Sequence, residues 1–316
     1  MRALYLDDKL SFRTDVAPPS PAPGESLIRV TTAGVCGTDV ELTRGYMTYR
    51  GVPGHEFVGR VESSARADLV GRRVVGEINA ACGHCASCRA GLGRHCPNRT
   101  VLGILGRGGT FADYITLPDE NLLPVPDNVP DNVAVMCEPL AAAYEIFEQA
   151  RIEPAEKIAI LGDGRLGAMV ALALKAEGFD PVIGGRHRNK LDRLALFEIK
   201  VSLEKDLQPG FDIVVDATGR PSGFDRAVEL LRPRGRLILK STAAASAPLN
   251  LAAVVVNEIT VIGSRCGRFA PALESLAAGR ARPFPLVTAT YPLEEGAAAL
   301  AATSDPDNFK VLLEIA

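Results

Sequence analysis

Hydrophobic and polar positions follow two different patterns along the chain. From Met1 to about Asp131, short apolar runs are separated by glycine and proline, which predicts an irregular, β-rich domain. The expected strands cover residues 27–31, 57–62, 73–75 and 111–116. A proline-rich segment, 123–131, then gives way to 134–150, whose alanine, leucine and glutamate content predicts a helix that bridges two domains.

The second pattern alternates apolar strands with helical segments. Strands are predicted at 157–161, 181–184, 211–216, 236–240 and 258–263, and helices at 166–177, 190–197 and 224–231. This alternation implies right-handed crossovers and a doubly wound parallel sheet, an α/β fold of the Rossmann type. A helix at 270–278 and an apolar run at 309–315 follow. We expect domains at 1–131 and 132–264, with residues 265–316 returning to the first domain.

Composition narrows the function classes. The 316 residues suffice for about two domains, and a net charge of −3 from 35 basic and 38 acidic residues gives no basic excess for a nucleic-acid partner. Acidic residues lie too near Met1 for a signal peptide, and no span of ~18 apolar residues predicts a membrane partner. Seven cysteines without a secretory signal fit a reducing compartment, so we expect a cytoplasmic protein.

Four of these cysteines are clustered within 15 positions, at Cys82, Cys85, Cys88 and Cys96. Four thiolates so close in sequence can close a tetrahedral shell around Zn²⁺. A closed all-sulfur shell leaves no position for a substrate, so this zinc is expected to be structural. The lobe spans about residues 80–98, and the metal would order a loop that has few large apolar side chains.

A glycine-rich loop, Gly162-x-Gly164-x-x-Gly167, follows the apolar strand 158–161 directly and opens a helix. In this setting the glycines permit a tight turn, close approach of a pyrophosphate, and packing of helix on strand. The pyrophosphate would lie at the helix N-terminus, beside Arg165 and Leu166. Since both flanks are correct, the loop predicts a dinucleotide cofactor, although a plain strand-turn-helix is the alternative.

The end of the next predicted strand decides which dinucleotide is expected. An acidic residue that binds the ribose diol belongs about twenty residues after the loop, but the sequence there contains Gly185, Arg186 and Arg188. A missing carboxylate beside guanidinium groups suits a 2′-phosphate, which arginine can bind with two hydrogen bonds. We therefore expect NADP(H) in preference to NAD(H), with a solvated basic turn as the alternative.

A second set of candidate metal ligands mixes donor types: Cys36, His55, Glu56 and Glu138. One sulfur, one imidazole and carboxylate oxygens make an adjustable shell, as a catalytic zinc requires if a substrate oxygen is to enter. Each residue alone has another explanation, because a single cysteine or histidine is often a core residue and a glutamate a surface one. Together, however, the four residues predict a catalytic zinc. With the structural zinc of the cysteine lobe, two zinc ions per chain are expected.

These features together resemble the zinc-dependent medium-chain dehydrogenase/reductase superfamily over essentially the whole chain. The matching segments are Gly34-Val35-Cys36-Gly37-Thr38-Asp39, Pro53-Gly54-His55-Glu56-Phe57-Val58-Gly59, Gly71-Arg72-Arg73-Val74, the cysteine lobe, Glu138-Pro139-Leu140-Ala141 and the Rossmann loop. The resemblance implies a GroES-like β-barrel catalytic domain, a Rossmann cofactor domain, an active site between them, and a homodimer or homotetramer. Glu138 followed by Pro-Leu-Ala resembles the polyol, sorbitol, threonine and glucose dehydrogenase branch.

The resemblance also implies residue roles. Thr38 would pass the substrate proton toward the cofactor ribose and solvent, and Thr218 would lie in the turn beside the nicotinamide ribose. Independently of the resemblance, Asp39 is expected to orient neighbouring groups. Glu41 stands where many relatives have a relay histidine. Cys137 precedes Glu138, which leaves a one-residue ambiguity about the fourth ligand, and the family register selects Glu138. Segments 240–242 and 264–266 end later strands and are further candidate contacts.

The expected function is hydride transfer between NADP(H), or NAD(H), and a secondary alcohol, polyol or sugar and its carbonyl compound. The same ligands would also serve a biosynthetic aldehyde or carbonyl reductase, because they do not encode a direction. A non-catalytic NADPH-binding protein of this fold is the third possibility. Intact catalytic ligands argue against that possibility.

Overall fold

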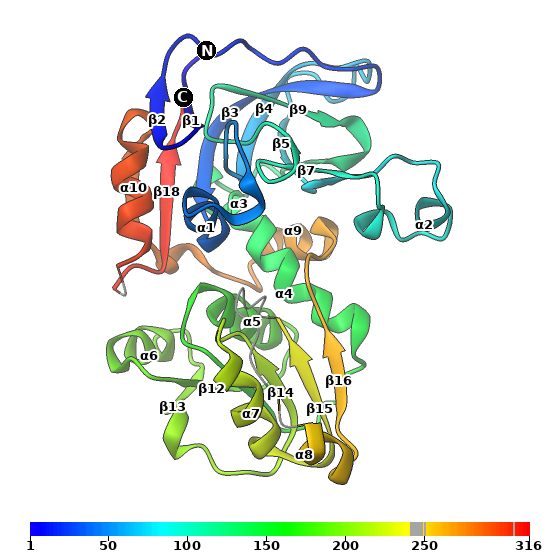
Figure 1. Cartoon of the computed structure of the whole chain (residues 1–316), viewed down its shortest axis with the longest axis vertical. Coiled ribbons are helices and arrows are strands. Elements are labelled where there is room, and N and C mark those ends of the chain that lie inside the picture. The colour runs from blue at the N-terminus through cyan, green and yellow to red at the C-terminus, as the bar shows by residue number, and fades with distance from the viewer. Residues whose placement is uncertain (241–248, 250, 306) are drawn as a thin grey trace. The chain divides into compact units, whose positions relative to one another are not determined.

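The computed structural model describes residues 1–240, 249, 251–305 and 307–316 (Figure 1). Within them the chain forms two compact units, residues 1–138 with 283–316, and residues 139–282. The candidate contacts Ser241 and Thr242 lie outside the described residues. No helix in the described part is long and apolar enough to cross a membrane.

The first unit is built mainly from short strands. They are β1 (Ala3–Leu6), β2 (Leu10–Arg13), β3 (Glu25–Val35), β4 (Glu56–Ser63), β5 (Arg73–Gly76), β6 (Asn79–Ala80), β7 (Thr100–Leu102), β8 (Gly106–Arg107), β9 (Tyr114–Pro118), β10 (Leu122–Pro124), β17 (Val287–Pro292) and β18 (Lys310–Glu314). The α-helices that lie wholly in this unit are α1 (Gly37–Thr43), α2 (Ala86–Arg89), α3 (Asp131–Ala134) and α10 (Gly296–Thr303).

Strand β3 organises the first unit. The main sheet has the order β10-β5-β4-β3-β18-β17, and β9 also pairs with β3. Alternate residues of β3, among them Ile28 and Val30, are fully buried, which is the pattern of a strand with one face on the core. The C-terminal strand β18 pairs with β3 so that Val311 lies opposite Val35, and Figure 1 shows this red strand beside the blue one. The C-terminal strand is therefore part of the main sheet of the first unit.

The second unit contains the strands β11 (Ile158–Leu161), β12 (Val182–Gly185), β13 (Lys200–Leu203), β14 (Phe211–Asp216), β15 (Leu231–Leu239) and β16 (Thr260–Gly263). Its helices are α5 (Arg165–Ala176), α6 (Arg188–Ala195), α7 (Pro221–Leu230), α8 (Leu251–Val256) and α9 (Phe269–Ala277). Helix α4 (Cys137–Gln149) begins in the first unit and runs into the second.

All six strands of the second unit pair in parallel, in the order β13-β12-β11-β14-β15-β16. The order reverses direction between β11 and β14, which is the arrangement of a doubly wound dinucleotide-binding sheet. A core of Leu161, Val214, Phe224 and Leu237 joins strands to helix α7. The predicted combination of a Rossmann sheet and a GroES-like β domain is therefore confirmed.

Several element boundaries differ from those predicted. The strand expected at 111–116 is Tyr114–Pro118, because Phe111 and Ala112 pair instead with the N-terminal strand β1. The helix expected from 134 begins at Cys137, since the ring of Pro139 would clash with the carbonyl of residue 135 in a longer helix. Strand β13 and helix α10 were not predicted.

The units also divide at other positions than the expected 131/132 and 264/265. The second unit extends to Arg282 because the segment after β16 packs on helix α4. A Cβ at Gly267 would contact the backbone of α4, and Arg268 forms an ion pair with Glu148 of that helix at 2.7 Å. Phe269, which begins α9, is buried. The return to the first unit therefore starts at Pro283.

Candidate functional site

The four clustered cysteines converge on one point in the first unit. The Sγ–Sγ distances are 3.9 Å for Cys82–Cys88, 3.5 Å for Cys85–Cys88, 3.7 Å for Cys85–Cys96 and 3.5 Å for Cys82–Cys96. Four sulfurs at ~2.3 Å from a zinc ion form a tetrahedron with edges of ~3.8 Å. The thiols therefore fit a tetrahedral zinc ion without rearrangement.

Local backbone structure holds this thiol cluster in place. Cys85 precedes the short helix α2, and its sulfur accepts a hydrogen bond from the backbone N–H of Cys88 at 3.5 Å. The sulfur of Cys96 accepts one from the N–H of Cys82 at the same distance. The backbone N–H of His84 lowers the pKa of the Cys82 thiol, which favours the thiolate form that binds a metal.

A second group of possible ligands lies at one end of the β3–β4 pair. Cys36 precedes helix α1, and His55 and Glu56 lie at the start of β4. One ligand atom from each of these three residues lies within 4.8 Å of the other two. His55 and Glu56 are buried, whereas Cys36 is half-buried. Sulfur, imidazole and carboxylate in this arrangement fit the mixed donor set of an open zinc site.

Asp39 connects two members of this group. Its Oδ2 accepts the backbone N–H of Cys36 at 2.8 Å, and its Oδ1 lies 3.2 Å from Nδ1 of His55. Burial lowers the pKa of His55, but the Asp39 carboxylate and Cys36 outweigh this effect and raise it well above its usual value. With Nδ1 facing Asp39, the other ring nitrogen is the one left for a metal. A carboxylate behind a ligating histidine is common in zinc sites.

Lys310 is the residue that sequence reasoning missed. It lies on β18, and its Nζ forms a buried ion pair with Oε2 of Glu56 and donates a hydrogen bond to the carbonyl of Val35 at 3.2 Å. Gly34 makes room for this pair, because a Cβ there would overlap Oε2 of Glu56. No local motif marks a lysine that is 254 residues from its partner.

The remaining predicted members of the site lie around this group. Oγ1 of Thr38 is 3.8 Å from Sγ of Cys36. Glu138 is not one of the three grouped residues. Burial raises its pKa to about 7, while the charge of His55 lowers this pKa and the charge of Glu56 raises it. Glu41, at the expected relay position, is exposed and pairs with Arg44 at 2.7 Å.

The glycine-rich loop of the second unit lies at the carboxyl end of β11. Gly162 has φ of +113°, and a Cβ there would lie 2.6 Å from the carbonyl oxygen of Ala217. Gly167 packs against the carbonyl of Gly162, so it has no room for a side chain. Helix α5 begins at Arg165, with Leu166 in its first turn, and its N-cap residue Gly164 makes no side-chain capping hydrogen bond. Its first N–H groups suit a pyrophosphate.

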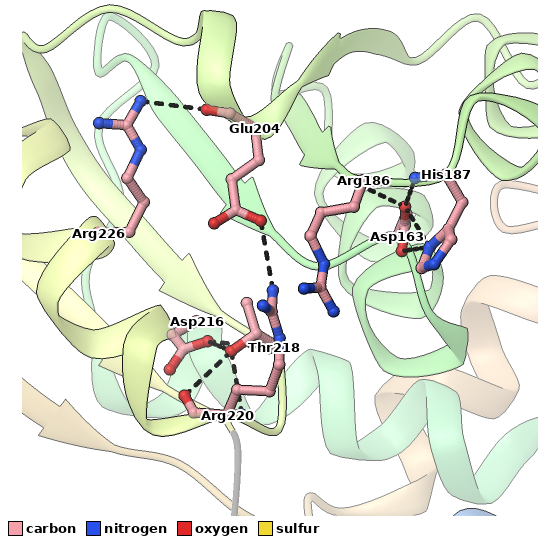
Figure 2. Close-up of polar contacts among 8 residues, drawn as sticks. All are labelled: Asp163, Arg186, His187, Glu204, Asp216, Thr218, Arg220 and Arg226. Carbon is pink, nitrogen blue, oxygen red and sulfur yellow. Dashed lines mark hydrogen bonds and ion pairs between the residues drawn. The ribbon is translucent and has the colours of Figure 1, made fainter. Parts of the chain in front are cut away.

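Asp163, inside this loop, holds the turn that follows β12 (Figure 2). Its Oδ2 accepts the backbone N–H groups of Arg186 and His187, both at 2.7 Å, and lies 3.0 Å from Nδ1 of His187. Gly185 allows this approach, because a Cβ there would lie 2.5 Å from the Asp163 side chain. Burial raises the pKa of Asp163, but these N–H groups outweigh it and keep the pKa below its usual value.

Unlike the ring of His187, the guanidinium of Arg186 is directed away from Asp163 (Figure 2). Arg186 and Arg188 are exposed, and the guanidinium of Arg186 has no partner among the residues that the structure describes. Thr218, in the turn after β14, donates from its backbone N–H and its hydroxyl to Asp216, at 2.9 and 2.7 Å. Its hydroxyl is thus engaged within its own turn.

Comparisons with known proteins agree with this architecture. The family model for the alcohol dehydrogenase GroES-like domain matches residues 22–127, and the model for a zinc-binding dehydrogenase matches residues 166–278. The L-threonine 3-dehydrogenase of Chelativorans sp. (strain BNC1) is 32% identical over 245 residues, 70% of each chain. Alcohol dehydrogenase TADH from Thermus sp. ATN1 is 28% identical, with a TM-score of 0.91 over 100% of both chains.

A third similar protein carries a cofactor. The alcohol dehydrogenase rspB from E. coli CFT073, complexed with NADH, is 25% identical, with a TM-score of 0.91 over 100% of this chain and 99% of its own. The chain therefore belongs to the zinc-dependent medium-chain dehydrogenase/reductase superfamily. It is an oxidoreductase of the zinc-dependent, NAD(P)-linked dehydrogenase class, as its sequence motifs predicted.

Proposed function

We propose that this protein interconverts a secondary alcohol, polyol or sugar hydroxyl with the corresponding carbonyl, using zinc and preferentially NADP(H). The observation that carries the proposal is the convergence of Cys36, His55 and Glu56 on one point. A relative named L-threonine 3-dehydrogenase supports a substrate with a secondary hydroxyl group.

The catalytic zinc would be held by Cys36, His55 and Glu56, with Glu138 as a fourth, exchangeable ligand. When bound, zinc supplies Lewis acidity that favours loss of the substrate's hydroxyl proton. Asp39 fixes the backbone of Cys36 and the ring of His55, so both donors keep their positions during turnover. The Thr38 hydroxyl, 3.8 Å from the Cys36 sulfur, accepts the proton and passes it toward solvent.

The dinucleotide supplies the hydride chemistry, and the second unit supplies its binding groups. The first N–H groups of α5, beside Arg165 and Leu166, would bind the pyrophosphate. The 2′-phosphate of NADP(H) would bind the guanidinium groups of Arg186 and Arg188, because no carboxylate ends β12 to take the ribose hydroxyls of NAD(H).

We also propose that the protein is a homo-oligomer, which the family resemblance implies. Strand β16 is at one end of its sheet, and apolar side chains around it are exposed: Val255 by 75%, Val256 by 79% and Val261 by 41%. An edge strand with exposed apolar neighbours suits pairing with a second copy. Light scattering would give the mass, and a monomer at micromolar concentration would contradict this assembly.

A substrate screen with metal analysis tests the function. Wild-type protein should contain about two zinc ions per chain and oxidise members of a panel of secondary alcohols, polyols and amino alcohols with NADP⁺. Glu56→Gln should lose most of this activity, whereas Glu41→Gln, an exposed carboxylate near the site, should keep it. A protein that holds zinc only in the cysteine lobe and transfers no hydride would overturn the proposal.

A further inference from the structure

An ion pair crosses the carboxyl ends of the parallel sheet. Glu204 follows β13, and Arg220 follows β14, yet Nη2 of Arg220 lies 3.3 Å from Oε2 of Glu204. In the sheet order, β12 and β11 lie between these two strands. Neighbouring strands are ~4.8 Å apart, so β13 and β14 are separated by roughly 14 Å. The two side chains together span this distance over the ends of β12 and β11.

The bridge therefore lies over the strand ends that carry the dinucleotide-binding loop and Arg186. Ligands of open α/β sheets bind outside these carboxyl ends, beside the point where strand order reverses. Figure 2 shows the guanidinium groups of Arg186 and Arg220 extending into the space between the turns after β12 and β14. Arg220 thus comes from the β14 side to the place where the adenosine ribose is expected.

Two backbone donors of the turn after β12 are already occupied. The N–H groups of Arg186 and His187 both donate to Asp163, which leaves neither of them for a phosphate. The exposed guanidinium groups nearby are better placed to bind a 2′-phosphate than these two N–H groups. Arg186 and Arg188 both come from the β12 side, and the oxygens of a phosphate dianion can also accept from a guanidinium on the β14 side.

Both ends of the bridge are held in position. Arg220 donates its backbone N–H to Oγ1 of Thr218 at 3.2 Å, and Thr218 is itself fixed by Asp216. On the other side, Arg226 donates to the carbonyl oxygen of Glu204 at 3.1 Å (Figure 2) and to that of Leu207 at 2.8 Å. The side chains of Arg220 and Glu204 are 31% and 17% exposed, so a ligand can still reach the guanidinium.

We propose that Arg220 is a further specificity-determining residue, which binds the 2′-phosphate of NADP(H) together with Arg186 and Arg188, and that Glu204 positions its guanidinium. This inference rests on the proposed preference for NADP(H). Glu204 holds the guanidinium of Arg220 in place. Because it also competes with the phosphate for this guanidinium, it lowers the affinity for the 2′-phosphate. A bound 2′-phosphate accepts hydrogen bonds from the guanidinium that Glu204 otherwise accepts.

Calorimetric binding of adenosine 2′,5′-bisphosphate and adenosine 5′-monophosphate tests the proposal without turnover. Arg220→Leu should weaken the bisphosphate about 10-fold or more, the worth of one charge-assisted hydrogen-bond pair, and leave the monophosphate within about twofold. Arg232→Leu is the matched control, because this arginine pairs with Asp212 at the amino end of the same sheet. It should change neither affinity.

A second variant tests the role of Glu204 in the opposite direction. Glu204→Gln removes the competing charge but keeps a hydrogen-bond acceptor, so it should tighten the bisphosphate several-fold and leave the monophosphate unchanged. In kinetics, Arg220→Leu should raise KM for NADP⁺ and leave kcat and KM for NAD⁺ nearly unchanged. A merely structural role would alter both cofactors alike.

The outcomes separate this inference from the proposed cofactor preference. If Arg186→Leu lowers bisphosphate selectivity and Arg220→Leu does not, the preference stands and the role of Arg220 is overturned. Equal weakening of both ligands by Arg220→Leu would place its contact on the adenine or 5′-phosphate and also overturn the proposal. A wild-type protein that binds the two nucleotides equally would overturn the preference and the inference together.

Discussion

Lys310 forms an ion pair with Glu56 inside the first unit, where the two side chains are 3% and 1% exposed. The pair joins the C-terminal strand β18 to the first residue of β4 across β3. A buried carboxylate is strongly destabilising without a counter-charge. Lys310 therefore supplies the counter-charge for Glu56 beside Cys36 and His55.

Removing this lysine should destabilise the protein. Lys310→Met leaves Glu56 buried and unpaired, so the free energy of unfolding in urea should fall by about 3–5 kcal/mol. Arg66→Met, which breaks the exposed Arg66–Asp68 pair of the same unit, should cost less than about 1 kcal/mol. Equal losses for the two variants would show that burial of the Lys310–Glu56 pair has no energetic weight.

The space at Gly34 gives a second test of the same pair. In Gly34→Ala the new methyl would overlap Oε2 of Glu56 and come within 3.0 Å of Nζ of Lys310. We expect a loss of about 1–3 kcal/mol, typical of overpacking, together with weaker retention of the catalytic zinc during dialysis against a chelator. Gly108→Ala is the control, since a Cβ there meets no atom within 4 Å. If Gly34→Ala were as stable as the control, the Lys310–Glu56 pair would be able to shift without loss of folding free energy.

The cysteine lobe should depend on its own metal. Cys88→Ser removes one corner of the sulfur tetrahedron, so the protein should carry about one zinc ion fewer per chain by elemental analysis. Because the metal orders this segment, limited proteolysis should then cut within residues 80–98. Full zinc content and an uncut lobe in Cys88→Ser would exclude this shell as the structural site.

Asp163 gives a pH-dependent prediction with a definite sign. Its folded-state pKa is lowered, so the stability it contributes is present above its unfolded pKa of about 3.9 and is lost as pH falls through the folded value. The free energy of unfolding of the wild type should exceed that of Asp163→Asn by about 1–3 kcal/mol at pH 7. This difference should stay constant down to about pH 5 and shrink below pH 4. Urea unfolding across this range measures it.

An exposed carboxylate in the same unit serves as the control for that series. Asp180 is 58% exposed and pairs with Lys200, so Asp180→Asn should shift stability by less than about 1 kcal/mol at every pH. A wild-type advantage over Asp163→Asn that grows as the solution is acidified would contradict the assigned sign.

The sequence by itself predicted the sites whose residues lie close together along the chain. The four cysteines of the lobe lie within 15 positions, so their spacing alone limits how they can be arranged around a metal. The loop Gly162 to Gly167 is likewise a local turn between a strand and a helix, and the structure forms both flanks as predicted. Family, fold class and cofactor type followed from such local motifs because each motif contains its own geometric requirement.

The tertiary structure alone decided which distant charges meet. Lys310 reaches Glu56 because β18 pairs with β3, and Arg220 reaches Glu204 because β14 and β13 lie in one sheet with two strands between them. Neither contact leaves a periodic or spaced signal, since strand order and register are set by burial of the whole sheet. The sequence determined the ligand types and the two folds, and packing of the strands determined the charges that surround those ligands.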